Sequence, residues 1–248
     1  MTGCPTHGMV LAAGLGRRMR PITENLPKPL VPLAGKTLLD RALDQLQAVN
    51  VGAATVNLHY LGHMIEGHLA ARSEPRITFS WETDLLLETG GGVAAALSTL
   101  GNSPFYVVNA DIAWEDGSHP ALSRLAEFWR DDTMDALLLL HPVALATGYD
   151  GVGDYRRDDD GALTRRRDEA TAQYVFSGVQ LLHPRLFVGA PAGPYSLTRQ
   201  YDEAEASNRL FGIVHDGAWH HIGTPAGLAE AEEIFGSTPV AGEGSNGG

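Results

Sequence analysis

The chain is organised around one stretch near its start, Val10-Leu-Ala-Ala-Gly-Leu-Gly-Arg-Arg-Met-Arg-Pro-Ile-Thr23, which is followed by Leu26-Pro-Lys-Pro-Leu30. Residues 8–13 form a short apolar run that is typical of a buried strand, and the run breaks into a loop at Gly14. Gly14 and Gly16 allow a sharp backbone turn and leave no side chain between the backbone N–H groups and a bound anion. The stretch therefore predicts a strand followed by an anion-binding loop.

Positive charge is concentrated in this loop. Residues 14–36 hold five cations against one acid, a local charge of +4 in a chain of formal net charge −12. The five cations are Arg17, Arg18, Arg20, Lys28 and Lys36. Lys28 stands between two prolines in a chain with only two lysines, which suggests that a compact ammonium on a fixed backbone is required there. A small polyphosphate is the ligand that such a loop fits.

Two better-known phosphate loops do not match the spacing. Gly35-Lys36-Thr37 is similar to the end of a P-loop, but the glycine required five residues earlier is replaced by Leu30. The dinucleotide-binding fingerprint needs a third small residue after Gly-x-Gly, and Met19 stands there. The loop therefore belongs to neither motif.

The composition restricts the class of protein. The acidic balance argues against binding to polymeric nucleic acid or to an anionic membrane, since both need a broad basic face. Cys4 is the only cysteine and fits a reducing compartment, so we expect a cytoplasmic protein. No apolar run is long enough to span a membrane, and the start lacks the character of a signal peptide. We expect one domain over residues 1–235 and a disordered tail over residues 236–248.

Strands and helices alternate through the first part of the chain. We expect strands at 53–58, 76–81, 105–109 and 136–140, and helices at 37–49, 60–71, 92–100 and 120–130. This alternation predicts an α/β fold with a doubly wound, mostly parallel sheet. Ligands bind beyond the carboxyl ends of the strands in such sheets, where the glycine loop and Asp111 both fall.

The pattern changes between residues 148 and 167. Glycines and runs of like charge indicate a small antiparallel hairpin that turns at Asp160-Gly161. Beyond it we expect strands at 174–182, 211–215 and 218–222, and helices at 183–188, 197–210 and 225–235. Thr224 is expected to cap the closing helix, which has Pro225 in its first turn.

The pattern L-A-A-G-x-G-x-R-M-R-P-x-T followed by P-K-P-L resembles the signature of the sugar-1-phosphate nucleotidyltransferases. The similarity continues in the family's order through Leu87–Gly92, Val108–Asp111, Phe176–Gly178 and Trp219–Thr224, so it covers nearly the whole chain apart from the tail. The chain is most similar to the N-acetylmuramate-1-phosphate uridylyltransferase type. Enzymes of this family join an NTP to a sugar 1-phosphate and release pyrophosphate.

The resemblance implies a Rossmann-like fold in which residues 8–141 bind the nucleotide and residues 142–235 bind the acceptor sugar. Arg18 occupies the family's G-x-G-x-R position and is expected to be the principal catalytic cation, together with Lys28 and Asp111. The nucleotide-binding residues that the resemblance implies are Leu11, Ala12, Ala13, Gly14, Gly16, Arg17, Arg18, Lys28, Glu88, Thr89, Gly90 and Gly91. Thr89 is also expected to cap the helix that follows.

The resemblance further implies a sugar pocket and a magnesium site. The sugar-binding residues are expected to be Asn109, Asp154, Ser177 and Gly178. Asp111 is the expected Mg²⁺ ligand, and many relatives carry a second aspartate where this chain has His221. Imidazole suits Mn²⁺ better than Mg²⁺, so Mn²⁺ is a second candidate. His221 has three open roles: a metal ligand, a phosphate donor or a space-filling side chain.

The implied reaction needs no catalytic base. A phosphate monoester loses its second proton near pH ~6, so the attacking oxygen is largely ionised at neutral pH. Positioning, cations and a metal must bring two anions together and stabilise the leaving pyrophosphate. We expect UTP and N-acetylmuramate 1-phosphate as substrates, in the recycling of peptidoglycan. The alternatives are a hexose- or heptose-1-phosphate guanylyl- or uridylyltransferase, and a catalytically silent ligand-sensing relative. Nothing in the sequence indicates an oligomeric state.

Overall fold

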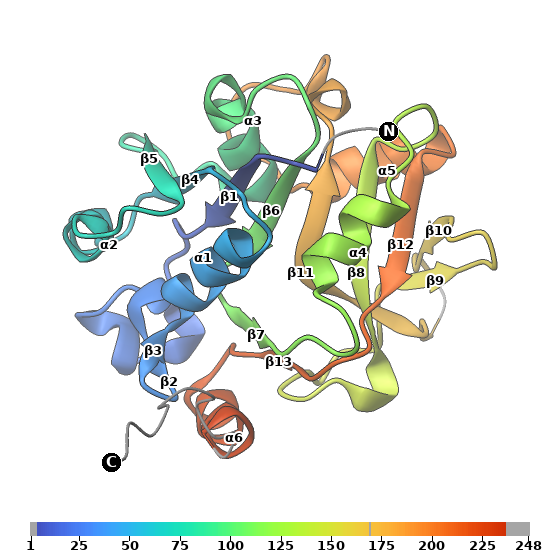
Figure 1. Cartoon of the computed structure of the whole chain (residues 1–248). Coiled ribbons are helices and arrows are strands. Elements are labelled where there is room, and N and C mark those ends of the chain that lie inside the picture. The colour runs from blue at the N-terminus through green and yellow to red at the C-terminus, as the bar shows by residue number, and fades with distance from the viewer. Residues whose placement is uncertain (1–3, 169, 237–248) are drawn as a thin grey trace, which may run out of the picture.

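A nine-stranded sheet runs through the centre of the computed structural model, which describes residues 4–168 and 170–236 (Figure 1). Seven strands follow the order β10-β9-β11-β6-β1-β4-β5, and β8 pairs with β11 and carries β12 on its other side. The strands of this sheet are β1 (His7–Leu11), β4 (Ala53–Leu58), β5 (Arg76–Trp81), β6 (Phe105–Asn109), β8 (Ala136–Pro142), β9 (Tyr155–Arg157), β10 (Leu163–Arg165), β11 (Tyr174–Leu182) and β12 (Leu210–Val214).

Most of the large strands point the same way. Parallel pairing joins β5 to β4, β4 to β1, β1 to β6, and β12 to β8, while β11 runs antiparallel between β6 and β8. The doubly wound α/β fold predicted from the alternation of strands and helices is therefore confirmed. The carboxyl ends of β1, β4 and β6 lie at one edge of the sheet, where ligands bind in such folds.

Helices cover both faces of the sheet (Figure 1). They are α1 (Leu38–Ala48), α2 (Gly62–Leu69), α3 (Glu88–Leu100), α4 (Ala121–Phe128), α5 (Thr198–Ala206) and α6 (Pro225–Phe235), with short 3₁₀ turns at Arg17–Met19, Ile22–Glu24, Lys28–Leu30, Val143–Leu145 and Pro184–Phe187. One core cluster joins the sheet to α1, α2 and α4, and another joins it to α3 and α5. None of these helices, within the described part of the chain, is long and apolar enough to cross a membrane.

Local sequence explains most of these elements. The leucines at 38, 39, 43 and 46 repeat at helical spacing, and all four are buried under the sheet or the glycine loop. Thr37 caps α1 by accepting a hydrogen bond from Asp40 N at 3.0 Å, and Thr224 caps α6 by accepting one from Gly227 N at 3.1 Å. The hairpin of β9 and β10 turns through Gly161, which has a φ of +95°. The predicted cap at Thr224 and the predicted hairpin are confirmed.

Several boundaries differ from the predictions. The predicted helix over 197–210 ends at Ala206, because Leu210 already belongs to β12. Two short strands, β7 (Ile112–Trp114) and β13 (Trp219–His221), pair antiparallel outside the main sheet, and β7 was not predicted. A further small pair joins β2 (Pro32–Leu33) to β3 (Lys36–Thr37). The expected disordered tail lies outside the described residues except for Gly236, whose N–H closes α6 on Glu232 O.

Candidate active site

The glycine loop leaves the end of β1 and is held by its own contacts. Gly16 has a φ of +58°, and a Cβ there would lie 3.1 Å from side-chain carbons of Lys28 and Thr23. The buried Thr23 donates its hydroxyl to Gly16 O at 2.7 Å. Gly16 therefore serves the shape of the loop, because both its backbone conformation and its packing exclude a side chain.

Gly14 differs from Gly16. Its φ lies outside the left-handed region, and a Cβ built on it meets no atom within 4 Å. Neither backbone strain nor packing within the described residues requires a glycine at this position. The open space beside Gly14 suits a ligand that approaches the backbone closely.

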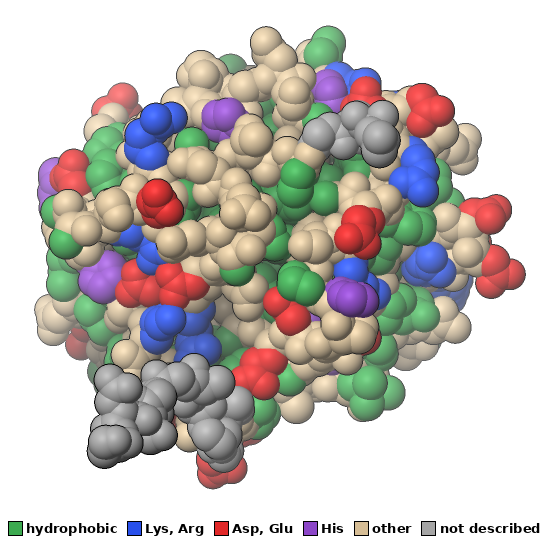
Figure 2. Space-filling view, in the orientation of Figure 1, with side chains coloured by type: hydrophobic (Ala, Val, Ile, Leu, Met, Phe, Trp, Pro, Cys, Tyr) green, Lys and Arg blue, Asp and Glu red, His purple; other side chains and the backbone are tan. Residues whose placement is uncertain are grey.

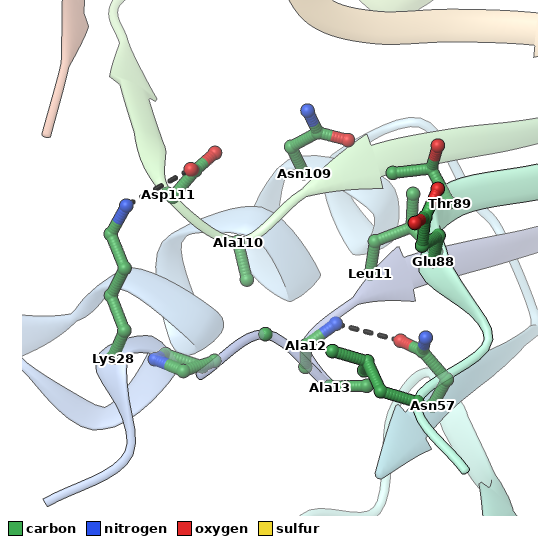
Figure 3. Close-up of a pocket in the computed structure, with 13 residues that line it drawn as sticks. Leu11, Ala12, Ala13, Lys28, Asn57, Glu88, Thr89, Asn109, Ala110 and Asp111 are labelled. Carbon is green, nitrogen blue, oxygen red and sulfur yellow. Dashed lines mark hydrogen bonds and ion pairs between the residues drawn. The ribbon is translucent and has the colours of Figure 1, made fainter. Parts of the chain in front are cut away.

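The loop brings Lys28 to the carboxylate that follows β6. Lys28 Nζ donates to Asp111 Oδ2 at 2.9 Å, with the two side chains 11% and 32% exposed (Figure 3). Burial disfavours the charged carboxylate, but the positive charge of Lys28, with further contributions from His221 and Arg18, outweighs it and places the pKa of Asp111 below its usual value. Asp111 is therefore ionised at neutral pH.

His221 and Arg18 approach the same carboxylate from other elements. Burial lowers the pKa of His221, and Lys28 and Arg18 lower it further, against the opposing effect of Asp111. His221 is therefore neutral at pH 7 and has a ring nitrogen lone pair. A Cβ at Gly223 would lie 2.7 Å from His221 Nε2 and 3.4 Å from Arg18 Nη1, so both side chains converge over that glycine. Lys28, His221 and the exposed Arg18 thus all lie within electrostatic reach of Asp111.

A cavity of about 200 Å³ opens between the glycine loop and the start of α3 (Figure 3). It is lined by Leu11, Ala12, Ala13, Gly14, Lys28, Pro29, Asn57, Leu86, Glu88, Thr89, Asn109, Ala110 and Asp111. We call it the loop cavity. Small side chains and backbone form the wall on the side of the glycine loop. Figure 3 shows Lys28 extending toward Asp111 at the end of the cavity away from Glu88 and Thr89.

The start of α3 is built differently from the prediction. The helix begins at Glu88, which has a φ of +59°, and no side chain caps it. The predicted cap at Thr89 is wrong, because its hydroxyl accepts a hydrogen bond from Leu197 N at 2.9 Å instead. Gly90 N and Gly91 N both donate to Tyr195 O, and Cβ atoms there would collide with Tyr195 or Gly193. These two glycines pack behind the wall and do not line the cavity.

A second cavity, of about 190 Å³, lies on the other side of Asp111. It is lined by Asn109, Asp111, Ile112, Tyr149, Asp154, Val175, Phe176, Ser177, Gly178, Trp219 and His221. We call it the ring cavity, because aromatic and imidazole rings form much of its wall. Asn109 and Asp111 belong to both cavities, so a group bound in one lies next to a group bound in the other.

An irregularity in β11 shapes the ring cavity. The register of β11 against β8 shifts between Phe176 and Gln180. Gly178 has a φ of +89° there, and a Cβ on it would lie 3.1 Å from Asn109 Nδ2. Only glycine therefore lets β11 pass this close to the end of β6.

All four predicted sugar-binding residues line the ring cavity, but not in the same way. Asp154 Oδ2 accepts a hydrogen bond from Phe176 N at 2.9 Å, and burial raises the pKa of this carboxyl. Ser177 is fully buried, and its hydroxyl accepts a hydrogen bond from Val179 N at 3.3 Å. Asp154 therefore offers a polar group to a ligand more readily than Ser177 does.

Other predicted residues lie outside both cavities. Arg17 is exposed on the first 3₁₀ turn, and Gly16 supports the loop from behind. Lys36, which contributed to the local positive charge, pairs with Asp44 of α1 at 2.6 Å. Figure 2 shows cationic and acidic side chains side by side on the face that carries α1. That part of the charge belongs to surface ion pairs.

Asn57, Tyr149 and Trp219 are among the lining residues that the sequence analysis did not predict. Asn57 stands near the end of β4 and accepts a hydrogen bond from Ala12 N at 2.7 Å, whereas Tyr149 and Trp219 line the ring cavity. A polar residue at the carboxyl end of a buried parallel strand is a signal that would have found Asn57. No such signal exists for the two aromatic residues, because they are brought there by loops and by β13.

The predicted metal ligands provide a small donor set. No group of three or more His, Cys, Asp or Glu side chains placed to hold a metal occurs within residues 4–168 and 170–236. The site offers one ionised carboxylate, Asp111, and one neutral imidazole, His221. Mg²⁺ commonly binds one or two protein carboxylates and takes its other ligands from phosphate and water, so this set fits a metal completed by substrates.

Comparisons with known proteins identify relatives of this chain. Residues 8–150 match the MobA-like NTP transferase domain. The N-acetylmuramate alpha-1-phosphate uridylyltransferase of Caulobacter vibrioides is 39% identical over 94% of this chain and 98% of its own length. The protein of the same name from Neisseria meningitidis serogroup B is 33% identical over 92% and 98%. A UDP-glucose pyrophosphorylase structure with UDP-glucose has the same fold, with a TM-score of 0.76 at 18% identity over 95% of this chain and 98% of that chain.

The domain match covers the strands and loops that form the cavity beside the glycine loop, and the two relatives cover the second cavity as well. The chain therefore belongs to the MobA-like NTP transferase family and is a sugar-1-phosphate nucleotidyltransferase.

Proposed function

We propose that this protein transfers UMP from UTP to N-acetylmuramate 1-phosphate and releases pyrophosphate. The observation that carries the proposal is the pair of cavities that share Asn109 and Asp111. The loop cavity suits a nucleoside triphosphate, because it has a side-chain-poor wall and a cation at one end. The ring cavity suits a sugar, because aromatic rings and a carboxyl group line it. The names of the two relatives supply the choice of base and sugar.

In the reaction, a phosphate oxygen of the sugar 1-phosphate attacks the α-phosphorus of UTP. A new P–O bond forms, and the bond between the α-phosphorus and the pyrophosphate oxygen breaks. The attacking phosphate is largely ionised near neutral pH, since its second pKa is near ~6. The protein therefore needs to position two anions and offset their charge rather than remove a proton.

Lys28 and Arg18 supply the fixed positive charge. The Lys28 ammonium is held at the junction of the two cavities by Asp111, where phosphate groups of both substrates would meet. Arg18 approaches the same junction from the exposed 3₁₀ turn. Charge-assisted contacts of this kind stabilise a transition state when they are in place before the reaction.

Asp111 and His221 would hold the divalent metal. A bound Mg²⁺ or Mn²⁺ would neutralise phosphate charge at this junction. The low pKa of Asp111 keeps its carboxylate available, and the low pKa of His221 keeps its imidazole unprotonated. We expect His221→Asp to shift the metal preference toward Mg²⁺, measured as the ratio of activities with Mg²⁺ and Mn²⁺. An unchanged ratio would exclude His221 as a ligand.

The direct test is a matrix of NTPs and sugar 1-phosphates, scored by pyrophosphate release with Mg²⁺ and with Mn²⁺. We expect the highest kcat/KM for UTP with N-acetylmuramate 1-phosphate. A higher value for a hexose or heptose 1-phosphate, or for GTP, would replace the proposed substrates within the same reaction class. Absence of release in every combination would favour a ligand-sensing protein.

A further inference from the structure

Glu82 is a buried carboxyl group beside the loop cavity. It follows β5 directly and is only 3% exposed. Its Oε1 accepts a hydrogen bond from Asn57 Nδ2 at 2.7 Å, and its Oε2 accepts one from Leu87 N at 2.7 Å. A buried carboxyl group costs free energy unless such donors satisfy it, so its presence calls for an explanation.

The hydrogen bonds of Glu82 continue into the glycine loop. Asn57 Nδ2 donates to Glu82 Oε1 at 2.7 Å. Asn57 Oδ1 accepts a hydrogen bond from Ala12 N, also at 2.7 Å (Figure 3). A backbone N–H can only donate, and a carboxylate can only accept. The two neighbours therefore fix which way the Asn57 amide faces.

This relay joins three walls of the loop cavity. It runs from Ala12 at the end of β1, through Asn57 at the end of β4 and Glu82 after β5, to Leu87 immediately before α3. Ala12, Asn57 and the first two residues of α3, Glu88 and Thr89, line the cavity. Glu82 itself does not line it.

Gly92 provides independent support, because it leaves room for the relay. A Cβ on Gly92 would lie 2.9 Å from Glu82 Oε1 and 3.0 Å from Asn57 Nδ2. Gly92 has no left-handed φ that would require glycine. Its small size therefore serves the relay and not the backbone.

From this arrangement we infer that Glu82 is a positioning residue for nucleotide binding. Through Asn57 it sets the spacing between the glycine loop and the start of α3, and so the width of the slot that receives the nucleoside part of UTP. The inference rests on the proposed function. It assigns a role to a residue that touches neither substrate.

The experiment measures UTP binding by calorimetry and both KM values by pyrophosphate release. In Glu82→Gln, an amide NH₂ must face either the Asn57 amide or Leu87 N, so one hydrogen bond is lost. We expect the Kd and KM for UTP to rise about tenfold, which corresponds to one buried hydrogen bond, while the KM for the sugar phosphate stays within about twofold. Glu66→Gln on the surface of α2 is the matched control and should change neither value.

A double variant tests the relay itself. Asn57→Asp alone places two carboxyl groups at hydrogen-bonding distance, so UTP binding should weaken as in Glu82→Gln. The double variant Asn57→Asp, Glu82→Gln restores every bond: Ala12 N donates to Asp, the Gln amide donates to Asp, and Leu87 N donates to the Gln oxygen. We expect its UTP affinity to return to within about threefold of wild type.

Gly92→Ala gives a second route to the same result, because its Cβ would push Glu82 and Asn57 apart. It should raise the Kd for UTP, whereas Gly67→Ala in α2, where a Cβ meets no atom within 4 Å, should not. Wild-type UTP binding in Glu82→Gln, or a double variant worse than both single variants, would overturn the inference alone. A wild-type protein that binds no nucleoside triphosphate would overturn the proposed function and the inference together.

Discussion

The two cavities that meet at Asp111 are built in opposite ways. The loop cavity takes most of one wall from a continuous stretch, Leu11–Gly14, and uses backbone and small side chains. The ring cavity takes its wall from separate segments, including β7, β11, β13 and the loop that carries Tyr149, and uses large rings. Triphosphates share one shape and charge, whereas sugars differ. A wall of backbone N–H groups therefore suits a nucleoside triphosphate, whereas a wall of side chains that can differ between proteins suits a particular sugar.

The largest effect should come from the pair that both cavities share. We expect Lys28→Ala and Asp111→Ala each to lower kcat/KM for both substrates at least ~100-fold, the scale of one preorganised charge contact. Steady-state kinetics with each substrate varied in turn measures this. The chain provides a matched control, since Lys36→Ala and Asp44→Ala break an ion pair of 2.6 Å on the surface. Equal losses in the control pair would show that general charge, and not this junction, matters.

The next effect separates the two glycines of the loop. Gly14→Ala should raise the KM for UTP about tenfold while the melting temperature stays the same, because the new Cβ enters open space beside the loop where UTP is proposed to bind. Gly16→Ala should instead destabilise the fold by about 1 kcal/mol or more, since its φ is +58° and its neighbours are at 3.1 Å. Thermal melts and UTP titrations of both variants check this. A destabilised Gly14→Ala would contradict the assignment of open space.

A smaller change should affect only the ring cavity. Asp154→Asn retains an oxygen for Phe176 N but loses the carboxyl group. We expect the KM for the sugar phosphate to rise roughly fivefold, the value of one polar contact, with the KM for UTP unchanged. Steady-state kinetics in which one substrate is varied while the other is saturating measures the two KM values separately. A change in the KM for UTP alone would show that Asp154 affects the loop cavity and not the ring cavity.

The smallest effect concerns stability behind the ring cavity. His141 and His215 are each 2% exposed, their ring centroids lie 5.9 Å apart, and His141 packs on Trp219. Burial lowers the pKa of both below 6.5, so the folded state binds fewer protons than the unfolded state. The part of the folding stability that depends on unprotonated His141 and His215 is therefore fully present above pH 6.5 and is lost as the pH drops below that value.

Thermal melts between pH 8 and pH 5 measure this loss, which we expect to be on the order of 1 kcal/mol by pH 5. His141→Leu should reduce the slope of the profile between pH 6.5 and pH 5, because it removes one of the histidines whose pKa is lowered by burial. Lys36→Ala, far from these rings, should leave the slope unchanged. A wild-type profile that is flat in this window would show that the two imidazoles titrate normally.

The sequence predicted a larger share of the residues that line the loop cavity than of those that line the ring cavity. Leu11–Gly14, Lys28 and Asp111 carry local signals, namely glycines after a strand, a lysine between prolines and an aspartate after a strand. The fold class followed from the alternation of strands and helices. Tyr149 and Trp219 carry no comparable signal, because an aromatic residue in a loop or short strand is equally compatible with the core.

The errors near α3 have one physical cause. Thr89 and the glycines after it have the composition of a cap followed by an open backbone, and the sequence does not show which distant segment covers them. In the fold, Tyr195 O accepts hydrogen bonds from Gly90 N and Gly91 N, and Leu197 N donates one to the hydroxyl oxygen of Thr89. A long-range backbone partner of this kind leaves no pattern in the residues that it binds.

By itself, the sequence determined the order of most strands and helices and the position of the glycine loop with its cluster of positive charge, because periodicity, glycine and proline act over a few residues. Only the tertiary structure decided that Asp111 pairs with Lys28 at the junction of two cavities, and that Glu82 reaches Ala12 through Asn57. Those contacts join residues far apart in the chain. They depend on the register of parallel strands and on how loops close over the sheet edge, which local sequence does not encode.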